Sequence, residues 1–161
     1  MATEPKWYAI IDGAQDPRLV DLVQQCSERS CLFKGESARS LAGVAPWLVR
    51  IATDEALLAT WQEHGRGRNW GVMLLSSLSL AELQRHFRKF LQAKLPDGTI
   101  ALFRFYDPRV FRAYITAATP AERASLFQGI VQYAVEREDD AGLHQYTLRD
   151  EQLLDGSALV A

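Results

Sequence analysis

Residues 99–110 read TIALFRFYDPRV, which combines the strongest strand signal in the chain with the clearest helix start. Aromatic and branched aliphatic side chains fill residues 100–106, and such side chains favour a pleated, largely buried strand. Asp97-Gly98 supplies a turn before this run. Asp107 follows it as a helix N-cap, and Pro108 takes the first helical position, where its missing N–H costs nothing. The stretch therefore predicts a strand that leads directly into a helix.

Arg104 is the one charged side chain in this apolar run, and burying its charge without a partner would be costly. Strand alternation places Phe103 and Phe105 on the core-facing side and Arg104 on the other. We therefore expect a carboxylate to pair with Arg104. Asp107 is the nearest candidate in the sequence, although strand geometry can select another. Together with Arg109 these charges are either a functional site or, as we favour, a structural ion-pair network at the corner between strand and helix.

The length and composition are those of one ordinary globular domain. The chain has 161 residues, of which 24% are charged and 48% apolar, and its formal net charge is −2 at pH 7. This composition excludes disordered and fibrous classes. The net charge is slightly negative, and the basic residues do not form a stripe with aromatic residues between them. We therefore expect no nucleic-acid partner.

The sequence also predicts a cytoplasmic protein without a membrane partner. No apolar run approaches the roughly eighteen residues that span a bilayer, and the N-terminus lacks the apolar stretch of a secretory signal. Cys26 and Cys31 are the only cysteines and form no disulfide framework.

Strands and helices alternate over the first hundred residues. Strands are predicted at residues 7–11, 31–33, 45–51, 70–75 and 100–106, and residues 36–43 are predicted as a loop. Two further strands, at residues 130–135 and 143–148, form a closing hairpin around a charged segment, residues 136–142. We therefore predict an α/β fold with a mixed, largely parallel sheet flanked by helices and a C-terminal antiparallel hairpin. Residues 1–150 form one domain, and residues 151–161 a C-terminal tail.

Capping patterns mark two more helix starts. Ser79 is predicted as an N-cap, with Glu82 at the third helical position reaching back to it in a capping box. Thr119 and Glu122 repeat the pattern, with a proline at the first helical position.

The best enzymatic candidates are Asp12 and Asp107, which both follow predicted strands, where α/β folds place ligands. Two such carboxylates could hold Mg²⁺ for phosphoryl chemistry, and a small Mg²⁺-dependent hydrolase is therefore the alternative function. Each aspartate also has a local structural explanation, Asp12 in a turn and Asp107 as a cap. The three histidines lack the spacing of metal ligands, and no glycine-rich loop opens a helix as a phosphate site requires.

Several short motifs, taken in order, resemble one family. They are WYAIIDGA (7–14), LFKG (32–35), VAPWLV (44–49), WG (70–71), LQRHFR (83–88) and the run from PDG at residue 96 through FRFYDPRV. In this order, over residues 7–126, they resemble the type VI secretion effector chaperones, or adaptor proteins, of the domain of unknown function 4123 family.

The resemblance implies a non-enzymatic cytosolic protein without a cofactor. Such a protein holds a secreted toxic effector, often encoded by a neighbouring gene, and loads it onto the spike protein of the type VI machine. Many relatives have a further helical lobe after the α/β part, whereas about a dozen residues follow the predicted hairpin here. The chain is therefore either a short member or a part of a longer one, and the place where cargo is held stays open.

A chaperone that hides an apolar cargo segment needs an exposed apolar patch or an open sheet edge with a polar rim. The hairpin at residues 130–148 offers such an edge, or else it covers the core. Tryptophans that begin strands beside loops are further candidates, although such aromatics belong more often to the core. The predicted recognition surface, with arginines at its rim, is Trp47, Trp70, Arg88, Arg104 and Arg109.

Overall fold

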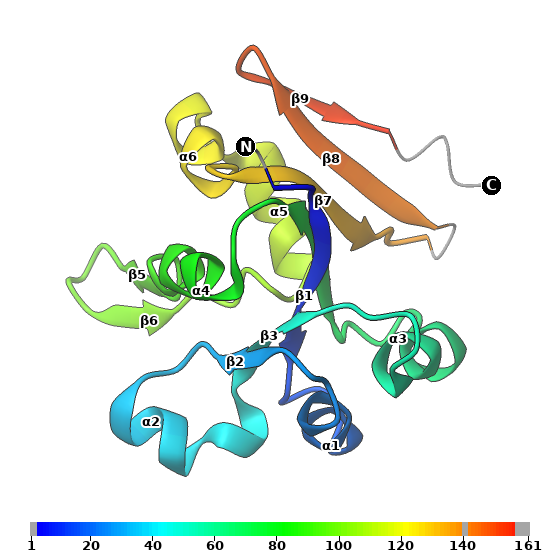
Figure 1. The fold of residues 1–161 in the computed structure, drawn as a ribbon. Coiled ribbons are helices and arrows are strands. Elements are labelled where there is room, and N and C mark those ends of the chain that lie inside the picture. Colours follow the sequence, from blue (N-terminus) through cyan, green and yellow to red (C-terminus); the bar gives the residue numbers. More distant parts are fainter. Residues whose placement is uncertain (1–2, 140–141, 157–161) are drawn as a thin grey trace.

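The computed structural model describes residues 3–139 and 142–156, and it is built on a central antiparallel sheet (Figure 1). Within these residues the sheet has seven strands in the order β2-β3-β1-β4-β7-β8-β9. The strands are β1 (Lys6–Asp12), β2 (Arg29–Cys31), β3 (Pro46–Arg50), β4 (Gly71–Ser76), β7 (Ile130–Glu136), β8 (Leu143–Arg149) and β9 (Gln152–Asp155). A separate two-stranded sheet consists of β5 (Gln92–Lys94) and β6 (Ile100–Leu102).

Helices cover both faces of the sheet. On one face, α4 (Leu80–Arg88), α5 (Pro108–Ala117) and α6 (Pro120–Leu126) contribute side chains to the larger apolar cluster. On the other, α1 (Arg18–Gln24), α3 (Ala56–Thr60) and the π-helical turn η2 (Trp61–Gly65) form the smaller one. The remaining helices, α2 (Gly35–Ser40) and the 3₁₀ turn η1 (Ala42–Val44), lie between β2 and β3. No helix in residues 3–139 or 142–156 has the length and apolar character needed to cross a membrane.

The expectation of a largely parallel sheet is wrong, because every pairing in it is antiparallel. β1 pairs with β3 on one side and with β4 on the other, and β2 pairs with β3. It follows that β1 and β2 point the same way with β3 between them, and that β3 and β4 point the same way with β1 between them. This is the split strand–helix–strand arrangement. In each of these two pairs of parallel strands, a third, antiparallel strand lies between the two strands that were expected to be direct neighbours.

The C-terminal hairpin is confirmed, since β7 and β8 pair antiparallel. Part of the predicted tail also belongs to the sheet, because β9 pairs with β8. Residues 157–161 of that tail, and residues 140–141 of the predicted hairpin turn, lie outside the described residues.

The predicted strand at residues 100–106 is corrected to a short strand followed by a turn. β6 ends at Leu102, and the N–H of Asp107 donates to the carbonyl of Arg104 to close the turn. Phe105 and Tyr106 are consecutive, and both are buried. In a strand with one covered face, consecutive side chains point to opposite faces, so only one of the two would be buried. Both residues leave the strand to fill the larger apolar cluster. The loop predicted at residues 36–43 likewise contains α2.

The predicted helix starts are confirmed. Asp107 is the N-cap of α5, where its carboxylate accepts the N–H of Arg109, and Pro108 begins the helix. Ser79 caps α4 by accepting the N–H of Glu82, and its hydroxyl donates to the Glu82 carboxylate. The complete capping box predicted at the start of α6 is present.

Replacing Asp107 with alanine is expected to lower the free energy of unfolding by about 1 kcal/mol at pH 7, because α5 loses its cap. Burial raises the pKa of Asp107, but the hydrogen bonds from Arg109 outweigh burial and hold this pKa below its ordinary value of 3.8. A lowered folded-state pKa stabilises the fold above the unfolded-state pKa, and the contribution is lost as the pH falls through the folded-state pKa. Urea titrations at several pH values measure both effects. If the difference in the free energy of unfolding between wild type and variant did not shrink below about pH 4, the role of Asp107 as an ionised cap would be contradicted.

Candidate functional site

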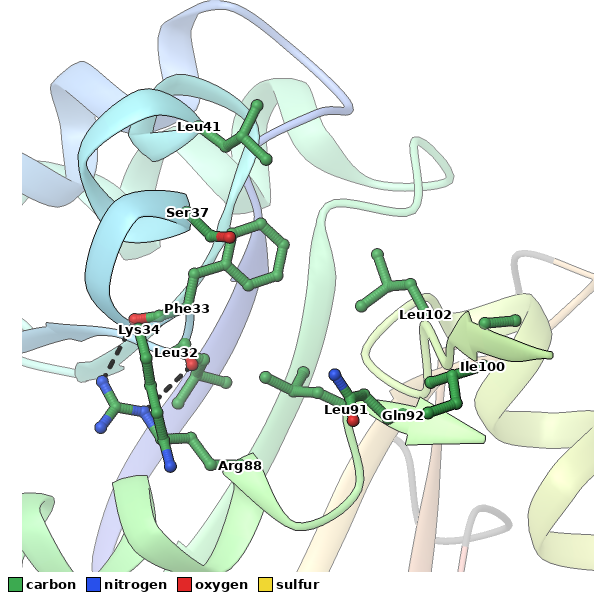
Figure 2. Close-up of a pocket in the computed structure, with 11 residues that line it drawn as sticks. Leu32, Phe33, Lys34, Ser37, Leu41, Arg88, Leu91, Gln92, Ile100 and Leu102 are labelled. Atoms are coloured by element: carbon green, nitrogen blue, oxygen red, sulfur yellow. Dashed lines mark hydrogen bonds between the residues drawn. The ribbon is translucent and has the colours of Figure 1, made fainter. Parts of the chain in front are cut away.

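An open groove lies between α2 and the β5–β6 hairpin, and we call it the α2–β6 groove (Figure 2). Its volume is about 520 Å³. The chain after β2 and helix α2 form one wall, the end of α4 forms the floor, and the hairpin forms the other wall. The lining residues are Leu32, Phe33, Lys34, Ser37, Leu41, Arg88, Leu91, Gln92, Ile100, Ala101 and Leu102.

Several large apolar side chains on the walls of the α2–β6 groove are exposed to solvent. Ile100 is 66% exposed, Leu102 is 48% exposed and Leu41 is 46% exposed. In Figure 2, Leu41 and Phe33 lie on one side, and Ile100 and Leu102 lie on the other. Single exposed apolar residues are common, but several gathered around one hollow make that hollow a candidate interaction site.

The hairpin sequence explains why Ile100 and Leu102 lie on the same face. Gly98 adopts a positive φ of 87° in the turn, and the Asp97 carboxylate accepts the N–H and hydroxyl of Thr99. The turn fixes the register in which Lys94 lies opposite Ile100 and Gln92 lies opposite Leu102. Because alternate residues share a face, the side chains of Ile100 and Leu102 lie together.

Arg88 fixes the opposite wall through backbone carbonyls. Its Nε donates to the carbonyl of Leu32 at 3.0 Å, and its Nη2 donates to the carbonyls of Cys31 at 3.1 Å and Phe33 at 3.2 Å. These acceptors are neutral, and within the described part of the chain Arg88 has no carboxylate partner. Its positive charge therefore stays uncompensated beside the groove, as does that of Lys34.

The two tryptophans predicted as recognition residues lie elsewhere. Trp70 is fully buried within the smaller apolar cluster, so its side chain is not accessible to a partner and that expectation is corrected. Trp47 is half-buried, and its indole N–H donates to the carbonyl of Ala42 at 3.0 Å.

Arg104 is paired with a carboxylate, as expected, but the partner is Asp12 rather than Asp107. The Asp12 side chain is only 1% exposed and also accepts the N–H of Ala14 and the amide of Gln15. Burial and the nearby Asp12 charge raise the pKa of Tyr106, beside this pair, to about 12, so the phenol stays neutral at physiological pH. The pair thus joins the end of β1 to the turn before α5.

Asp107 is paired in the same way, by the Arg109 guanidinium at 2.7 Å. Each aspartate of the hydrolase alternative is therefore bound by an arginine and by backbone N–H groups. Among residues 3–139 and 142–156, no group of three or more His, Cys, Asp or Glu side chains has the arrangement to hold a metal ion. Arg88 lines the groove, whereas Arg104 and Arg109 do not, and a partner-binding role for these arginines stays a prediction.

Sequence reasoning missed Leu41, Ile100 and Leu102 as site residues, because it assigned residues 100–106 to a buried strand and residues 36–43 to a loop. One signal could have revealed the hairpin. Residues 91–95 read LQAKL, alternate apolar with polar side chains, and stand just before the PDG turn. Two short strand-like runs on either side of such a turn predict a hairpin.

The fold and groove define a small antiparallel α/β domain with an open groove that both apolar and positively charged side chains line. The chain belongs to the family described as "Domain of unknown function (DUF4123)", which matches residues 7–125. The matched range includes every residue of the α2–β6 groove. No curated protein and no solved structure matches the chain.

Proposed function

We propose that the protein is a cytoplasmic chaperone or adaptor that binds a type VI secretion effector and helps to load it onto the spike protein. Membership of the DUF4123 family, together with the ordered motifs, supports this function. Binding requires no catalysis and no cofactor, and it depends on the burial of apolar surface.

The single observation on which the proposal depends is the α2–β6 groove. Its exposed leucine and isoleucine side chains would be poorly placed in a protein that binds nothing. A specific complex buries on the order of 1,600 Å² in total, and the central contacts provide most of the binding energy. The groove is the natural centre of such an interface, with charged residues at its rim.

The hydrolase alternative has no comparable support. Asp12 and Asp107 accept hydrogen bonds from separate arginines, Arg104 and Arg109, and each has a local structural role. A reaction would have to displace these guanidinium groups before either carboxylate could bind Mg²⁺.

The adaptor proposal is tested by coexpression with the effector encoded beside this gene and with the spike protein, followed by affinity purification. Replacing Ile100 and Leu102 together with aspartate is expected to weaken effector binding by about tenfold or more, because charge replaces apolar contact at the centre of the interface. Val131→Asp is the matched control, since Val131 is 48% exposed but lies on β7, outside the groove. The thermal midpoints of both variants are compared with that of wild type.

A double variant that folds and binds the effector as tightly as wild type would remove the α2–β6 groove from consideration. A wild-type protein that binds neither the effector nor the spike protein would overturn the adaptor proposal itself.

A further inference from the structure

We propose that the effector segment enters the α2–β6 groove as an extended strand, pairs with the free edge of β6, and places an acidic side chain beside Lys34 and Arg88. The inference rests on the proposed function, because the partner is the effector named there. It adds the conformation and the chemistry of the bound segment.

Hydrogen bonds inside the hairpin determine which backbone groups of β6 face outward. The N–H of Phe103 donates to the carbonyl of Leu91 at 2.7 Å, and the N–H of Leu95 donates to the carbonyl of Thr99 at 2.8 Å. In an antiparallel pair, backbone groups point toward and away from the partner strand at alternate residues. The amides and carbonyls of Ile100 and Leu102 therefore point away from β5.

The outer edge of β6 has no strand beside it among the residues that the structure describes. Within the described residues, β5 and β6 form a sheet of two strands only. Natural proteins commonly protect a free edge with lysine, proline or a bulge. β6 reads Ile-Ala-Leu and has none of these devices.

The free edge of β6 borders the groove. Ile100, Ala101 and Leu102 line the same hollow as Ser37 and Leu41 of α2. In Figure 1, β6 lies on the side of the hairpin nearer to α2. An effector segment that added to β6 as a strand would form main-chain hydrogen bonds with it. Every second side chain of that segment would enter the groove.

The groove also carries positive charge. Lys34 lies on the wall opposite β6 and Arg88 lies at the floor, and neither has a carboxylate partner in the described part of the chain. The nearest acidic residue of α2, Glu36, is paired with Arg39. An acidic side chain in the bound segment therefore complements the groove, whereas a basic one is repelled.

The test uses the full chain and overlapping synthetic peptides that cover the sequence of the effector, with binding measured by fluorescence anisotropy. Peptides that bind are expected to have an apolar residue at every second position and an Asp or Glu toward one end. The best peptide is then made in two N-methylated forms, each with alternate amides blocked. Only amides on one side of a strand bond to β6, so one form is expected to lose about tenfold or more in affinity and the other to bind as before.

Protein variants supply the complementary test. Leu102→Pro removes an outward-facing N–H while leaving the bonds between β6 and β5, because proline is tolerated at a strand edge. It is expected to weaken the peptide by about tenfold or more, beyond the effect of Leu102→Ala, which keeps the N–H. Lys34→Glu is expected to weaken an acidic peptide and to strengthen an analogue in which lysine replaces the acidic residue.

Hydrogen exchange on the intact complex with the effector provides a readout that does not depend on any variant folding. The amides of Ile100 and Leu102 are expected to exchange about tenfold more slowly in the complex, whereas that of Ala101 is already bonded to β5 and changes less.

If the effector binds but both N-methylated peptides bind alike and these amides gain no protection, strand addition is overturned and the adaptor function stands. If the free protein forms dimers that Leu102→Pro abolishes, the edge serves a second copy of this chain and the inference is overturned. If wild type binds no effector, both proposals fail together.

Discussion

Replacing Trp70 with alanine is expected to lower the free energy of unfolding by about 3–5 kcal/mol, because the change leaves a large cavity in the smaller apolar cluster. The Trp70 side chain is fully buried, and it packs so tightly that a Cβ added at Gly65 would lie 2.5 Å from its ring. The Arg18 guanidinium lies 5.6 Å from the centre of the same ring. Urea denaturation at pH 7 measures the loss.

Two matched variants make this prediction specific. Trp70→Phe keeps most of the volume, and the indole N–H it removes has no hydrogen-bond partner within the described residues, so a smaller loss is expected. Trp7→Ala removes a tryptophan that is 37% exposed and is expected to cost less than Trp70→Ala. Similar losses for Trp7→Ala and Trp70→Ala would contradict the buried position. Any weaker partner binding by Trp70→Ala would reflect a destabilised fold rather than a lost contact, because the Trp70 side chain is fully buried.

Replacing Arg104 with methionine is expected to cost about 2–3 kcal/mol, because a buried charge that loses its partner is strongly destabilising. Asp12, which is 1% exposed, would keep only the hydrogen bonds from Ala14 and Gln15. The estimate lies below the range for fully buried pairs because the Arg104 side chain is 39% exposed and water screens part of the interaction.

Arg109→Met is the matched control for the Arg104 experiment. Arg109 also pairs with an aspartate, but its side chain is 57% exposed, and Asp107 keeps a bond from the backbone N–H of residue 109. The expected loss is below about 1 kcal/mol. Equal losses for the two methionine variants in urea unfolding would contradict a structural role specific to the Asp12–Arg104 pair.

Features that depend on neighbouring residues could be predicted from the sequence. The cap at Asp107, the proline at position 108 and the cap at Ser79 were all correct, because each depends on residues within one helical turn. The hairpin of β7 and β8 was correct for a similar reason. Local hydrogen bonding determines these features wherever the segment lies in the fold.

Features that depend on distant residues could not be predicted in this way. Alternating strands and helices indicate the direction of successive strands, but they do not show that β3 lies between β1 and β2. Arg104 pairs with Asp12 and not with Asp107, because a turn brings Arg104 to the end of β1, which is far away in the sequence. The α2–β6 groove joins three segments, and the sequence pattern assigned Leu41 to a loop and Ile100 and Leu102 to a strand without showing that they line one hollow.

The place of β1 in the middle of the sheet also affects the order in which the chain folds. Tyr8 lies opposite Arg50 on one side and Leu74 on the other, so both neighbours of β1 come from much later in the sequence. During synthesis, β1 therefore waits unpaired until β3 and β4 have left the ribosome. Pairings over such long sequence separations raise the contact order and slow folding relative to a helical bundle of the same length. The nascent chain passes through a stage in which β1, a strand that is largely buried in the finished domain, is exposed, and the chain is more prone to aggregation at this stage than after folding.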